Sequence, residues 1–325
     1  MTRLPDLVIL TEGDWARGLG HLGRCLGYAR QWRRMGREVL WIVDGDDAAR
    51  RFLEDETVVW RRWQDDGDIP EVADAVAIAD AYGASPVALD AIAGRAAAAV
   101  YLDDLELDDY PPGLVVHSAP GPLDRSGRRA EWLIGPAWQP MPSAFWTVAQ
   151  RKPVAETIGS VLILVGGTDL RDLGGRLAAL ARSAYPKSRI HLVRGAGARG
   201  EVPDSGAVTV HRSLPPEVLR DLMLGADLAL SAAGQTLYQL ARCGVSTLMI
   251  GVADNQAKHL REWPGTGAML SAGMWDAPGL DDRILHGLES LKPAGVRAAM
   301  SAAGQTAVDG RGAARLAERI GHILA

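Results

Sequence analysis

The chain has 325 residues, of which 47% are hydrophobic and 23% are charged, and its formal net charge at pH 7 is -5. This composition is ordinary for a folded globular protein, and the length favours two compact domains over one. The acidic balance argues against a nucleic-acid-binding protein, because such proteins present a basic face to the phosphate backbone. No apolar run reaches the roughly 18 residues of a membrane-spanning helix, so we expect no membrane span.

The start of the chain and its cysteines bear on the cellular compartment. Residues 1–6 lack the apolar core of a secretory signal peptide, and a predicted strand follows directly. Cys25 and Cys243 fall in predicted helices in different halves of the chain, so we expect no disulfide. Both observations predict a cytoplasmic protein.

Short apolar runs alternate with helical patterns in the first part of the chain. The predicted strands are 7–11, 38–43, 57–60, 87–89, 98–102 and 114–117, and the predicted helices include 22–35 and 71–82. Near-continuous apolar strands between helices are typical of a parallel sheet that is covered on both faces.

Prolines interrupt this pattern between 136 and 153, and this stretch is predicted as a linker. A second series follows, with strands at 161–165, 189–193, 208–211, 227–230 and 247–250 and helices at 171–184, 216–224, 235–243, 255–262, 280–288 and 312–323. The sequence therefore predicts an α/β protein with two Rossmann-like domains, 1–145 and 155–325, each with a doubly wound parallel sheet. Ligands of such sheets bind outside the carboxyl ends of the strands, and we expect them in a cleft between the domains, with the linker as a hinge.

The segment Gly18-Leu19-Gly20-His21-Leu22-Gly23-Arg24 lies between the first predicted strand and helix. Glycines let backbone amides approach a ligand, and a helix N-terminus favours an anion, so Gly18 and Gly20 are predicted substrate contacts. The segment also contains the G-x-G-x-x-G pattern of dinucleotide-binding proteins, and Asp44 ends the second predicted strand about 20 residues later. Residues 12–17 separate the first glycine from its strand, which fits that pattern poorly. A nicotinamide-dependent dehydrogenase is therefore kept as the last alternative.

His21 and Arg24 are the candidate chemical groups of this segment. A helix N-terminus disfavours the imidazolium form, and a neutral His21 can act as a general base. We expect Asp14 or Glu12 to orient its second ring nitrogen. The alternative is that His21 only caps the helix or binds backbone. Arg24 has two interpretations of equal weight, a substrate contact or an ion pair with a carboxylate of the fold.

Two loops of the second half combine glycines with hydroxyl residues at the start of a predicted helix. Free backbone N–H groups and the helix dipole suit a phosphate, although an ordinary strand-to-helix turn has the same pattern. The predicted nucleotide contacts of the first loop are Gly166, Gly167, Thr168 and Asp169. Those of the second loop are Ser231, Gly234, Gln235 and Thr236, followed one turn later by Gln239, which can reach a ribose.

A third loop places Asp254, Asn255 and Gln256 after the strand at 247–250. Asn255 and Gln256 are predicted substrate contacts, and the alternative is that this loop only caps a helix. A metal site is not expected. The adjacent Asp103 and Asp104 point apart without a third ligand, and the histidines show no ligand spacing. We predict no cofactor.

Six motifs in chain order resemble a known family. They are G-x-G-H-x-x-R at 18–24, D-D-L at 103–105, G-P-x-W followed by F at 135–145, G-G-T-D at 166–169, S-A-x-G-x-T-x-x-x-L at 231–240 and D-N-Q at 254–256. Together they are similar to the UDP-sugar hydrolase of pseudaminic acid biosynthesis and to its relatives among spore-coat polysaccharide biosynthesis proteins. That group is similar in turn to the UDP-N-acetylglucosamine transferase of peptidoglycan synthesis and shares its GT-B fold. The resemblance covers nearly the whole chain.

The resemblance implies a hydrolase that releases UDP from an activated acetamido-deoxy sugar. Water attacks the anomeric carbon with inversion and without a metal, and the family's loop histidine, here His21, is the base. UDP would lie against 166–169 and 231–239, and Asn255 and Gln256 would face the sugar and phosphates. The alternatives are a GT-B glycosyltransferase with the same donor and a nucleotide-sugar-binding homologue without catalysis.

Several positions depart from the family pattern. Gln239 replaces a glutamate whose carboxylate accepts two hydrogen bonds from ribose hydroxyls, and an amide offers only one acceptor oxygen. Leu19 and Gln235 replace small hydroxyl residues, and His117 and Ser118 replace an amide-bearing strand end. These changes lie on the ligand side of the predicted domains, so they bear on the identity of the substrate more than on the fold.

Overall fold

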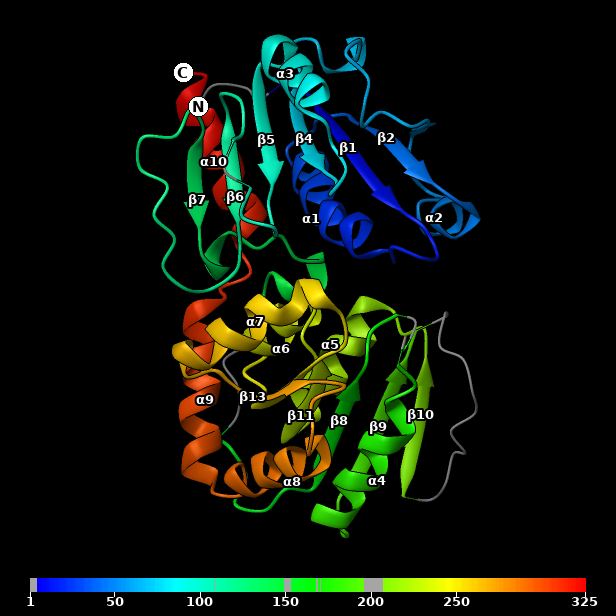
Figure 1. Cartoon of the computed structure of the whole chain (residues 1–325), viewed down its shortest axis with the longest axis vertical. Coiled ribbons are helices and arrows are strands. Elements are labelled where there is room, and N and C mark those ends of the chain that lie inside the picture. The colour runs from blue at the N-terminus through cyan, green and yellow to red at the C-terminus, as the bar shows by residue number, and fades with distance from the viewer. Residues whose placement is uncertain (1–4, 108, 149–152, 168, 170, 196–206) are drawn as a thin grey trace. The chain divides into compact units, whose positions relative to one another are not determined.

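The structure is a computed structural model, and it describes residues 5–107, 109–148, 153–167, 169, 171–195 and 207–325. The chain forms two compact units, each built on its own β-sheet (Figure 1). The first unit comprises Met1–Ser118, Pro122–Ser143 and Arg311–Ala325, and the second comprises Ala119–Gly121 and Ala144–Gly310.

The sheet of the first unit has seven parallel strands in the order β3-β2-β1-β4-β5-β6-β7. Their bounds are β1 Leu7–Gly13, β2 Val39–Gly45, β3 Val58–Trp60, β4 Val76–Asp80, β5 Ala98–Leu102, β6 Leu114–His117 and β7 Glu131–Ile134. The chain first runs outward from β1 to β3 and then continues from β4 on the other side of β1. The carboxyl ends of β1 and β4 therefore form a topological switch point, the usual ligand position in such sheets.

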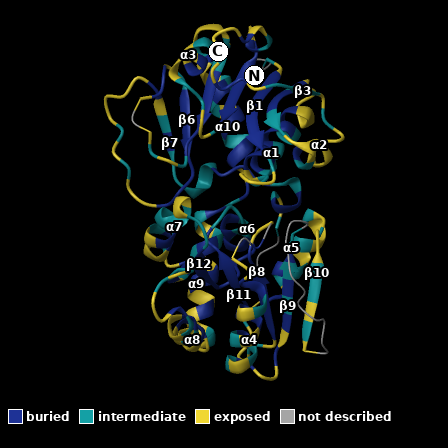
Figure 2. Cartoon of the chain, turned by 45° about the vertical axis from the view of Figure 1, so that its right-hand side comes forward, coloured by how far each residue is buried: buried dark blue, intermediate teal, exposed yellow. Residues whose placement is uncertain are grey.

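Helices cover both faces of this sheet, as the side chains of β1 show. Leu7 and Ile9 pack into one core with α1 (Gly20–Arg34) and α10 (Gly312–Ile323). Val8 and Leu10 pack into a second core with α3 (Pro86–Arg95). Figure 2 shows the central strands as buried elements between helices with exposed outer faces. Burial on both faces explains why the strands are apolar without alternation.

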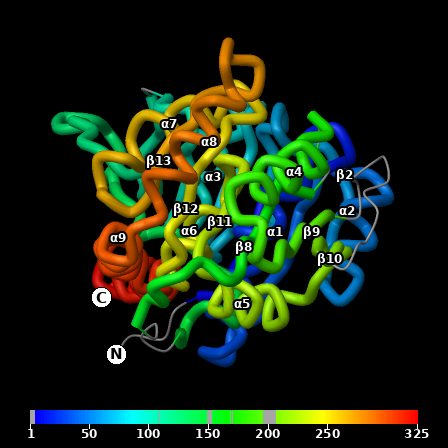
Figure 3. Tube along the Cα trace, turned by 90° about the horizontal axis from the view of Figure 1, so that it is seen from below, coloured from blue at the N-terminus to red at the C-terminus, as the bar shows by residue number. Residues whose placement is uncertain are grey.

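The second unit has six parallel strands in the order β10-β9-β8-β11-β12-β13, which can be followed in Figure 3. Their bounds are β8 Ser160–Leu164, β9 Arg189–Arg194, β10 Val208–Arg212, β11 Leu228–Ala232, β12 Thr247–Gly251 and β13 Met269–Met274. Val161 and Ile163 of β8 pack against α4 (Gly174–Ala184) and α8 (Leu280–Ser290). The switch point of this sheet lies between β8 and β11.

The remaining helices are shorter or lie at the margins of the two sheets. They are α2 Asp47–Phe52, α5 Pro216–Gly225, α6 Thr236–Arg242, α7 Ala257–Glu262 and α9 Ala294–Ala307, with 3-10 turns η1 Pro70–Val72, η2 Pro136–Trp138, η3 Ser143–Phe145, η4 Asp254–Gln256 and η5 Trp263–Thr266. Cys25 and Cys243 are buried and form no disulfide. Within the described residues, we find no helix with the length and apolarity that crossing a bilayer requires.

Helix α10 belongs to the first unit, although the sequence places 155–325 in one domain. Ala313, Leu316, Ala317 and Ile320 form its apolar face and join the core that contains α1 and β1. Arg319 adds an ion pair to Glu131 of β7. The predicted boundaries therefore differ from the structure at the end of the chain, because α10 buries its apolar face on the first sheet.

Two predicted elements are wrong in type. The predicted helix at 71–82 is η1 followed by β4, and the predicted strand at 87–89 belongs to α3. Strand β4 is fully buried, so it lacks the alternation that marks a strand. Helix α3 begins with a side-chain cap, because Ser85 accepts a hydrogen bond from the amide of Ala88 at 3.3 Å, and Pro86 follows it.

The predicted linker contains η2 and η3 and is held by side chains within each unit. In the first unit, Arg315 donates to the carbonyl of Ala137. In the second, the guanidinium of Arg242 donates to the carbonyl oxygens of Phe145, Trp146 and Val148. The prolines thus mark a stretch whose carbonyls are satisfied by arginines instead of a strand ladder.

Candidate functional site

The β1–α1 loop of the first unit is a compact turn that leads into α1. Asp14 and Gly18 form an isolated bridge, and Gly18 has a φ of 84°, which glycine adopts without strain. No side chain caps α1, and its first turn has no acidic residue. A Cβ placed on Gly18 or Gly20 would meet no atom within 4 Å. The loop backbone therefore has open space beside it, as a ligand-binding turn requires.

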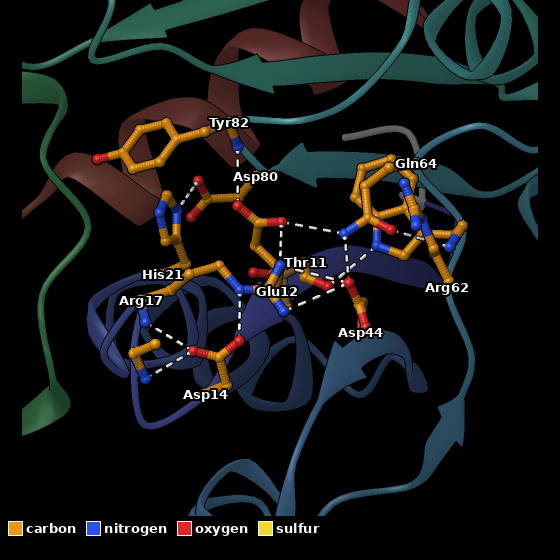
Figure 4. Close-up of polar contacts among 12 residues, drawn as sticks. Thr11, Glu12, Asp14, Arg17, His21, Asp44, Arg62, Gln64, Asp80 and Tyr82 are labelled. Atoms are coloured by element: carbon orange, nitrogen blue, oxygen red, sulfur yellow. Dashed lines mark hydrogen bonds and ion pairs between the residues drawn. The ribbon is translucent and has the colours of Figure 1, made fainter.

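His21 lies in the first turn of α1 and is held by Asp80, the last residue of β4 (Figure 4). Its ring Nδ1 is 2.6 Å from Oδ1 of Asp80, and the edge of the Tyr82 ring packs against it at a centroid distance of 4.5 Å. The residue is 6% exposed, and its Nε2 has no hydrogen-bond partner among the described residues. With the proton on Nδ1 facing the carboxylate, Nε2 presents a lone pair. This is the arrangement of a general base.

The expectation that Asp14 or Glu12 orients the His21 ring is wrong. The carboxylate of Asp14 instead accepts hydrogen bonds within its own loop, from the amides of Ala16 and Arg17 at 2.8 and 2.6 Å. These amide bonds and the neighbouring Arg17 guanidinium outweigh the effect of burial and lower the pKa of Asp14. Asp14 therefore shapes the β1–α1 turn and does not contact His21.

Of the two interpretations of Arg24, a substrate contact or an ion pair with a carboxylate, the structure shows the ion pair. Its Nε and Nη2 bind the two carboxylate oxygens of Asp80 at 2.6 and 2.5 Å, and its Nη1 binds Asp104 at 2.7 Å. Arg24 is 7% exposed and Asp80 is fully buried. All three guanidinium nitrogens of Arg24 thus donate hydrogen bonds to aspartate side chains of the first unit.

The charge state of Asp80 follows from these contacts. Burial alone would raise the pKa of its carboxyl group, but the Arg24 guanidinium and the His21 ring hold that pKa well below its usual range. Asp80 is therefore an ionised carboxylate in the interior, and it can stabilise an imidazolium on His21 without taking its proton.

A second arginine, Arg17, forms ion pairs with several carboxylates near the carboxyl ends of β1 and β2. Arg17 contacts Glu12 at 2.6 Å, Asp14 at 2.7 Å and Asp44 at 3.3 Å. The amide of Gln64 donates to Glu12 and Asp44, both at 3.0 Å. Figure 4 shows these side chains beside the His21–Asp80 pair. Two guanidiniums, those of Arg17 and Arg24, thus bind five carboxylates, those of Glu12, Asp14, Asp44, Asp80 and Asp104.

The end of β5 carries a second buried pair of histidine and aspartate. Asp103 lies 2.8 Å from Nδ1 of His117 and accepts a hydrogen bond from the Tyr110 hydroxyl at 2.9 Å. Burial and the adjacent Asp103 carboxylate raise the pKa of Tyr110, so its hydroxyl stays protonated and donates. Asp103 therefore contacts His117, whereas Asp104 accepts a hydrogen bond from Arg24.

In the second unit, the loop after β8 combines open glycines with a buried helix cap. A Cβ on Gly166 or Gly167 would meet no atom within 4 Å, and Gly166 has a φ of 87°. Thr168 lies outside the described residues. The carboxylate of Asp169 is buried and accepts from the amides of Leu173 and Gly174 at 2.9 and 3.1 Å. The Asp169 carboxylate therefore binds backbone amides at the N-terminus of α4, and the glycines are the part of this loop that is open to a ligand.

The loop after β11 leads into α6 through Gly234. The hydroxyl of Ser231 donates to the carbonyl of Ala232 at 3.0 Å, so this predicted contact is used within the loop. Thr236 begins α6, directly after Gln235, and Gln239 follows one turn later. The side chain of Gln239 is partly exposed and has no hydrogen-bond partner in the described part of the chain.

Side chains of the second unit join these loops to the loop after β12. The carbonyl of Ala233 lies 2.8 Å from Nδ1 of His259, and Oε1 of Gln256 accepts from the amide of Val252 at 2.9 Å. Arg171 donates to the carbonyl of Val252 at 3.2 Å. A Cβ on Gly234 would lie 3.7 Å from Nε2 of Gln256. The three glycine-containing loops therefore meet at one edge of the second sheet, as predicted from the parallel strands, with Asn255 exposed in η4.

The sequence analysis missed several residues of these sites, among them Asp80, Tyr82 and His259. Asp80 ends β4 and Tyr82 lies two residues further on; this stretch was predicted as helix, although an aspartate at the end of an apolar run is a usable signal. His259 lies in α7, a helix that the sequence predicts, but nothing in the sequence indicates that its ring reaches Ala233.

Comparison with known proteins shows the fold but no family. No family model matches the chain, and no curated protein matches it. Among solved structures, MurG of Acinetobacter baumannii superposes with a TM-score of 0.64 at 13% identity, covering 98% of this chain and 100% of that one. The spinosyn rhamnosyltransferase SpnG in complex with thymidine diphosphate gives 0.62 at 14%, covering 96% and 100%. A putative UDP-N-acetylglucosamine 2-epimerase of Listeria monocytogenes gives 0.57 at 10%, covering 97% and 96%. The chain thus has the predicted GT-B fold.

Proposed function

We propose that this chain is an enzyme that transfers the sugar of a nucleotide sugar to an acceptor hydroxyl, with His21 as the general base. The observation that carries the proposal is the His21–Asp80 pair at the carboxyl ends of β1 and β4. In this ring one nitrogen lies 2.6 Å from an ionised carboxylate and the other has no partner within the described part of the chain, an arrangement that suits proton transfer. Solved structures with this fold include glycosyltransferases, and one of them was obtained with thymidine diphosphate.

The proposed step is a direct displacement at the anomeric carbon. Nε2 of His21 takes the proton of the acceptor hydroxyl as its oxygen forms a bond to that carbon. The bond from the anomeric carbon to the phosphate oxygen breaks, and its electron pair leaves with the nucleoside diphosphate. Attack opposite to the leaving group inverts the configuration. Asp80 stays ionised and stabilises the imidazolium that forms.

The nucleotide is assigned to the loops of the second unit. Backbone amides near Gly166, Gly167 and Gly234 are the proposed phosphate contacts, since a Cβ on either of the first two would meet no atom within 4 Å and one on Gly234 would meet only Gln256, at 3.7 Å. Thr168, Ser231, Gln235 and Thr236 remain proposed polar contacts of the same nucleotide. Gln239 is proposed to bind the ribose. Asn255, with the amide N–H groups of Gln256, is proposed to bind sugar or phosphate.

Hydrolysis is the second candidate, favoured by the six ordered motifs described above. In that case a water molecule replaces the acceptor, and the substrate is a UDP-activated acetamido-deoxy sugar. Both reactions use the same base and the same leaving group. They differ in whether release of the nucleoside diphosphate depends on an added acceptor.

The test is to incubate the protein with UDP-, TDP-, GDP- and CMP-sugars, with and without a panel of acceptor alcohols, and to measure nucleotide release. His21→Ala should lower release by about 10²- to 10⁴-fold, the usual contribution of a positioned base. His286→Ala, an exposed histidine on α8, is the matched control and should leave release unchanged. Undiminished release by His21→Ala, or no release from any donor, would overturn the proposal.

A further inference from the structure

We propose that the ligand that meets His21 is an amphipathic cation, with an ammonium group and an apolar part in addition to its reacting hydroxyl. This names the acceptor class and rests on the proposed role of His21. The preference for such a ligand concerns binding and is measurable without turnover. Three independent features of the first unit support it: its charge, its exposed apolar side chains and the vacant nitrogen of His21.

The first feature is an excess of negative charge at the carboxyl edge of the first sheet. Five carboxylates contact two guanidiniums there, which leaves an excess of three formal negative charges. No lysine occurs in 1–151 or 311–325, so the first unit has no lysine side chain that could neutralise this edge. Among acceptors of similar size, this field favours one with an ammonium group over one with a carboxylate.

The second feature is a set of large apolar side chains exposed at the same edge, here called the apolar rim. Its members follow β1, β4 and β5, whose carboxyl ends share one edge of the parallel sheet: Trp15 is 47% exposed, Tyr82 40%, Leu105 45% and Leu107 42%. The backbone of Trp15 is fixed, because its amide donates to Asp46 at 3.0 Å. Exposed aromatic faces beside carboxylates suit an organic cation.

The rim and the carboxylates are in direct contact at Tyr82. Its ring packs against His21, and its hydroxyl donates to Asp104 at 3.4 Å, next to Leu105 in the chain. One ligand can therefore touch an aromatic ring, a carboxylate and the base within this contact. A purely apolar ligand would leave the carboxylates without a new partner, and a purely polar one would leave the rim exposed to water.

The third feature is Nε2 of His21. It belongs to a residue that is more than nine-tenths buried, and it has no protein partner among the described residues. His21 Nε2 is not among the buried side-chain atoms that lack a partner, so it can be reached from outside the protein, and a nitrogen of this kind is expected to bind water or a ligand. Since the ring presents a lone pair there, the ligand must donate a hydrogen bond, as a hydroxyl does. The three features together describe an amino alcohol with an apolar group.

The experiment uses calorimetry on the full chain with four probes: hexylammonium, methylammonium, 1-hexanol and hexanoate. Hexylammonium should bind about tenfold more tightly than the other three at low salt, and raising the salt to about 0.5 M should remove most of this advantage. Equal or tighter binding of hexanol or hexanoate would overturn the proposal. So would the absence of measurable hexylammonium binding at millimolar concentrations.

Variants locate the binding site. Asp44→Asn and Trp15→Ala should each weaken hexylammonium binding several-fold, and neither touches the Arg24–Asp80 pair. Asp282→Asn, on α8 of the second unit, is the control and should bind as the wild type does. Weaker binding by the control, or unchanged binding by Asp44→Asn and Trp15→Ala, would place the cation elsewhere and refute the proposal. Nucleotide release is measured separately, so failure of the cation preference and failure of the proposed reaction give different results.

Discussion

At the carboxyl edge of the first sheet, charged side chains bind one another, whereas the corresponding edge of the second sheet is held mainly by neutral groups and backbone. In the first unit, Asp80 is buried between the Arg24 guanidinium and the His21 ring. In the second, the carbonyls and amides of Ala233 and Val252 are fixed by imidazole, amide and guanidinium groups. The same parallel architecture thus supports two kinds of surface.

The difference corresponds to two chemical tasks. Proton transfer needs a titratable group whose geometry is fixed, and buried charges fix it because each is costly to displace. Binding a diphosphate needs backbone amides that a ligand can approach closely, and side chains would obstruct them. We propose that the first edge holds the base and the second the nucleotide, and most of the following predictions test one of these two edges.

The largest effect is expected for Asp80→Asn. The amide can present its NH₂ group to Nδ1 of His21 and favour the wrong tautomer, as when the aspartate of a catalytic triad is replaced. We expect kcat for nucleotide release to fall by about 10²- to 10⁴-fold, with little change in nucleotide affinity. Steady-state kinetics with separate nucleotide titration measures both. An equal loss in affinity would mean that Asp80 supports the fold and not the base.

Arg24→Met should cost about 3–5 kcal/mol in the free energy of unfolding, because it leaves the Asp80 carboxylate buried without a cation. Chemical denaturation at pH 7 measures this loss. Arg129→Met, which removes an exposed ion pair with Asp109, is the control and should cost little. A similar small cost for both variants would contradict the buried ion pair.

The pH dependence of the same variant follows from the sign of the Asp80 pKa shift. In the wild type this pKa is depressed, so its contribution to stability is present above about pH 4, the unfolded value, and is lost as the pH falls through the native value. In Arg24→Met, burial is no longer offset and the pKa of Asp80 should rise. The variant should therefore regain part of its deficit as the pH falls from 7 towards 4.

Gly234→Ala tests the nucleotide edge alone. The added methyl group would lie 3.7 Å from Gln256, an ordinary contact, so the thermal midpoint should stay close to that of the wild type. If a phosphate approaches this backbone, its Kd should rise about tenfold, the equivalent of one lost hydrogen bond to a charged group. Calorimetry with UDP and TDP measures it. Gly225→Ala, at the end of α5, is the control and should bind normally.

The smallest effect is expected at the exposed margin of the second sheet, where Nδ1 of His191 lies 3.1 Å from Nε2 of His211. Burial, and then the neighbouring His211 and Arg189, lower the pKa of His191. The unfolded chain therefore binds more protons below about pH 6.5, and stability should decrease slightly as the pH falls through that value. His191→Gln should make the free energy of unfolding less dependent on pH in this range. An unchanged pH dependence would contradict the lowered pKa of His191.

Much of the fold follows from the sequence, and particular residues show why the rest does not. His21 was predictable because β1 and α1 have clear patterns and glycines mark the turn between them. Asp80 was not, since β4 is buried on both faces and its alanine-rich sequence gives no strand alternation. Strands β7 and β13 and helix α9 also escaped prediction. The ion pairs of Arg24 depend on residues more than fifty positions away, which a local pattern does not identify.

The position of α10 has a consequence for how the protein is made. Residues 311–325 are synthesised after the whole second unit, yet they complete the core of the unit whose strands are synthesised first. Until then, the nascent first unit exposes the apolar surface that Leu316 and Ile320 will cover, while the whole second unit is still being translated. A truncation that removes α10 would therefore damage the first unit, whose strands lie far from α10 in the sequence.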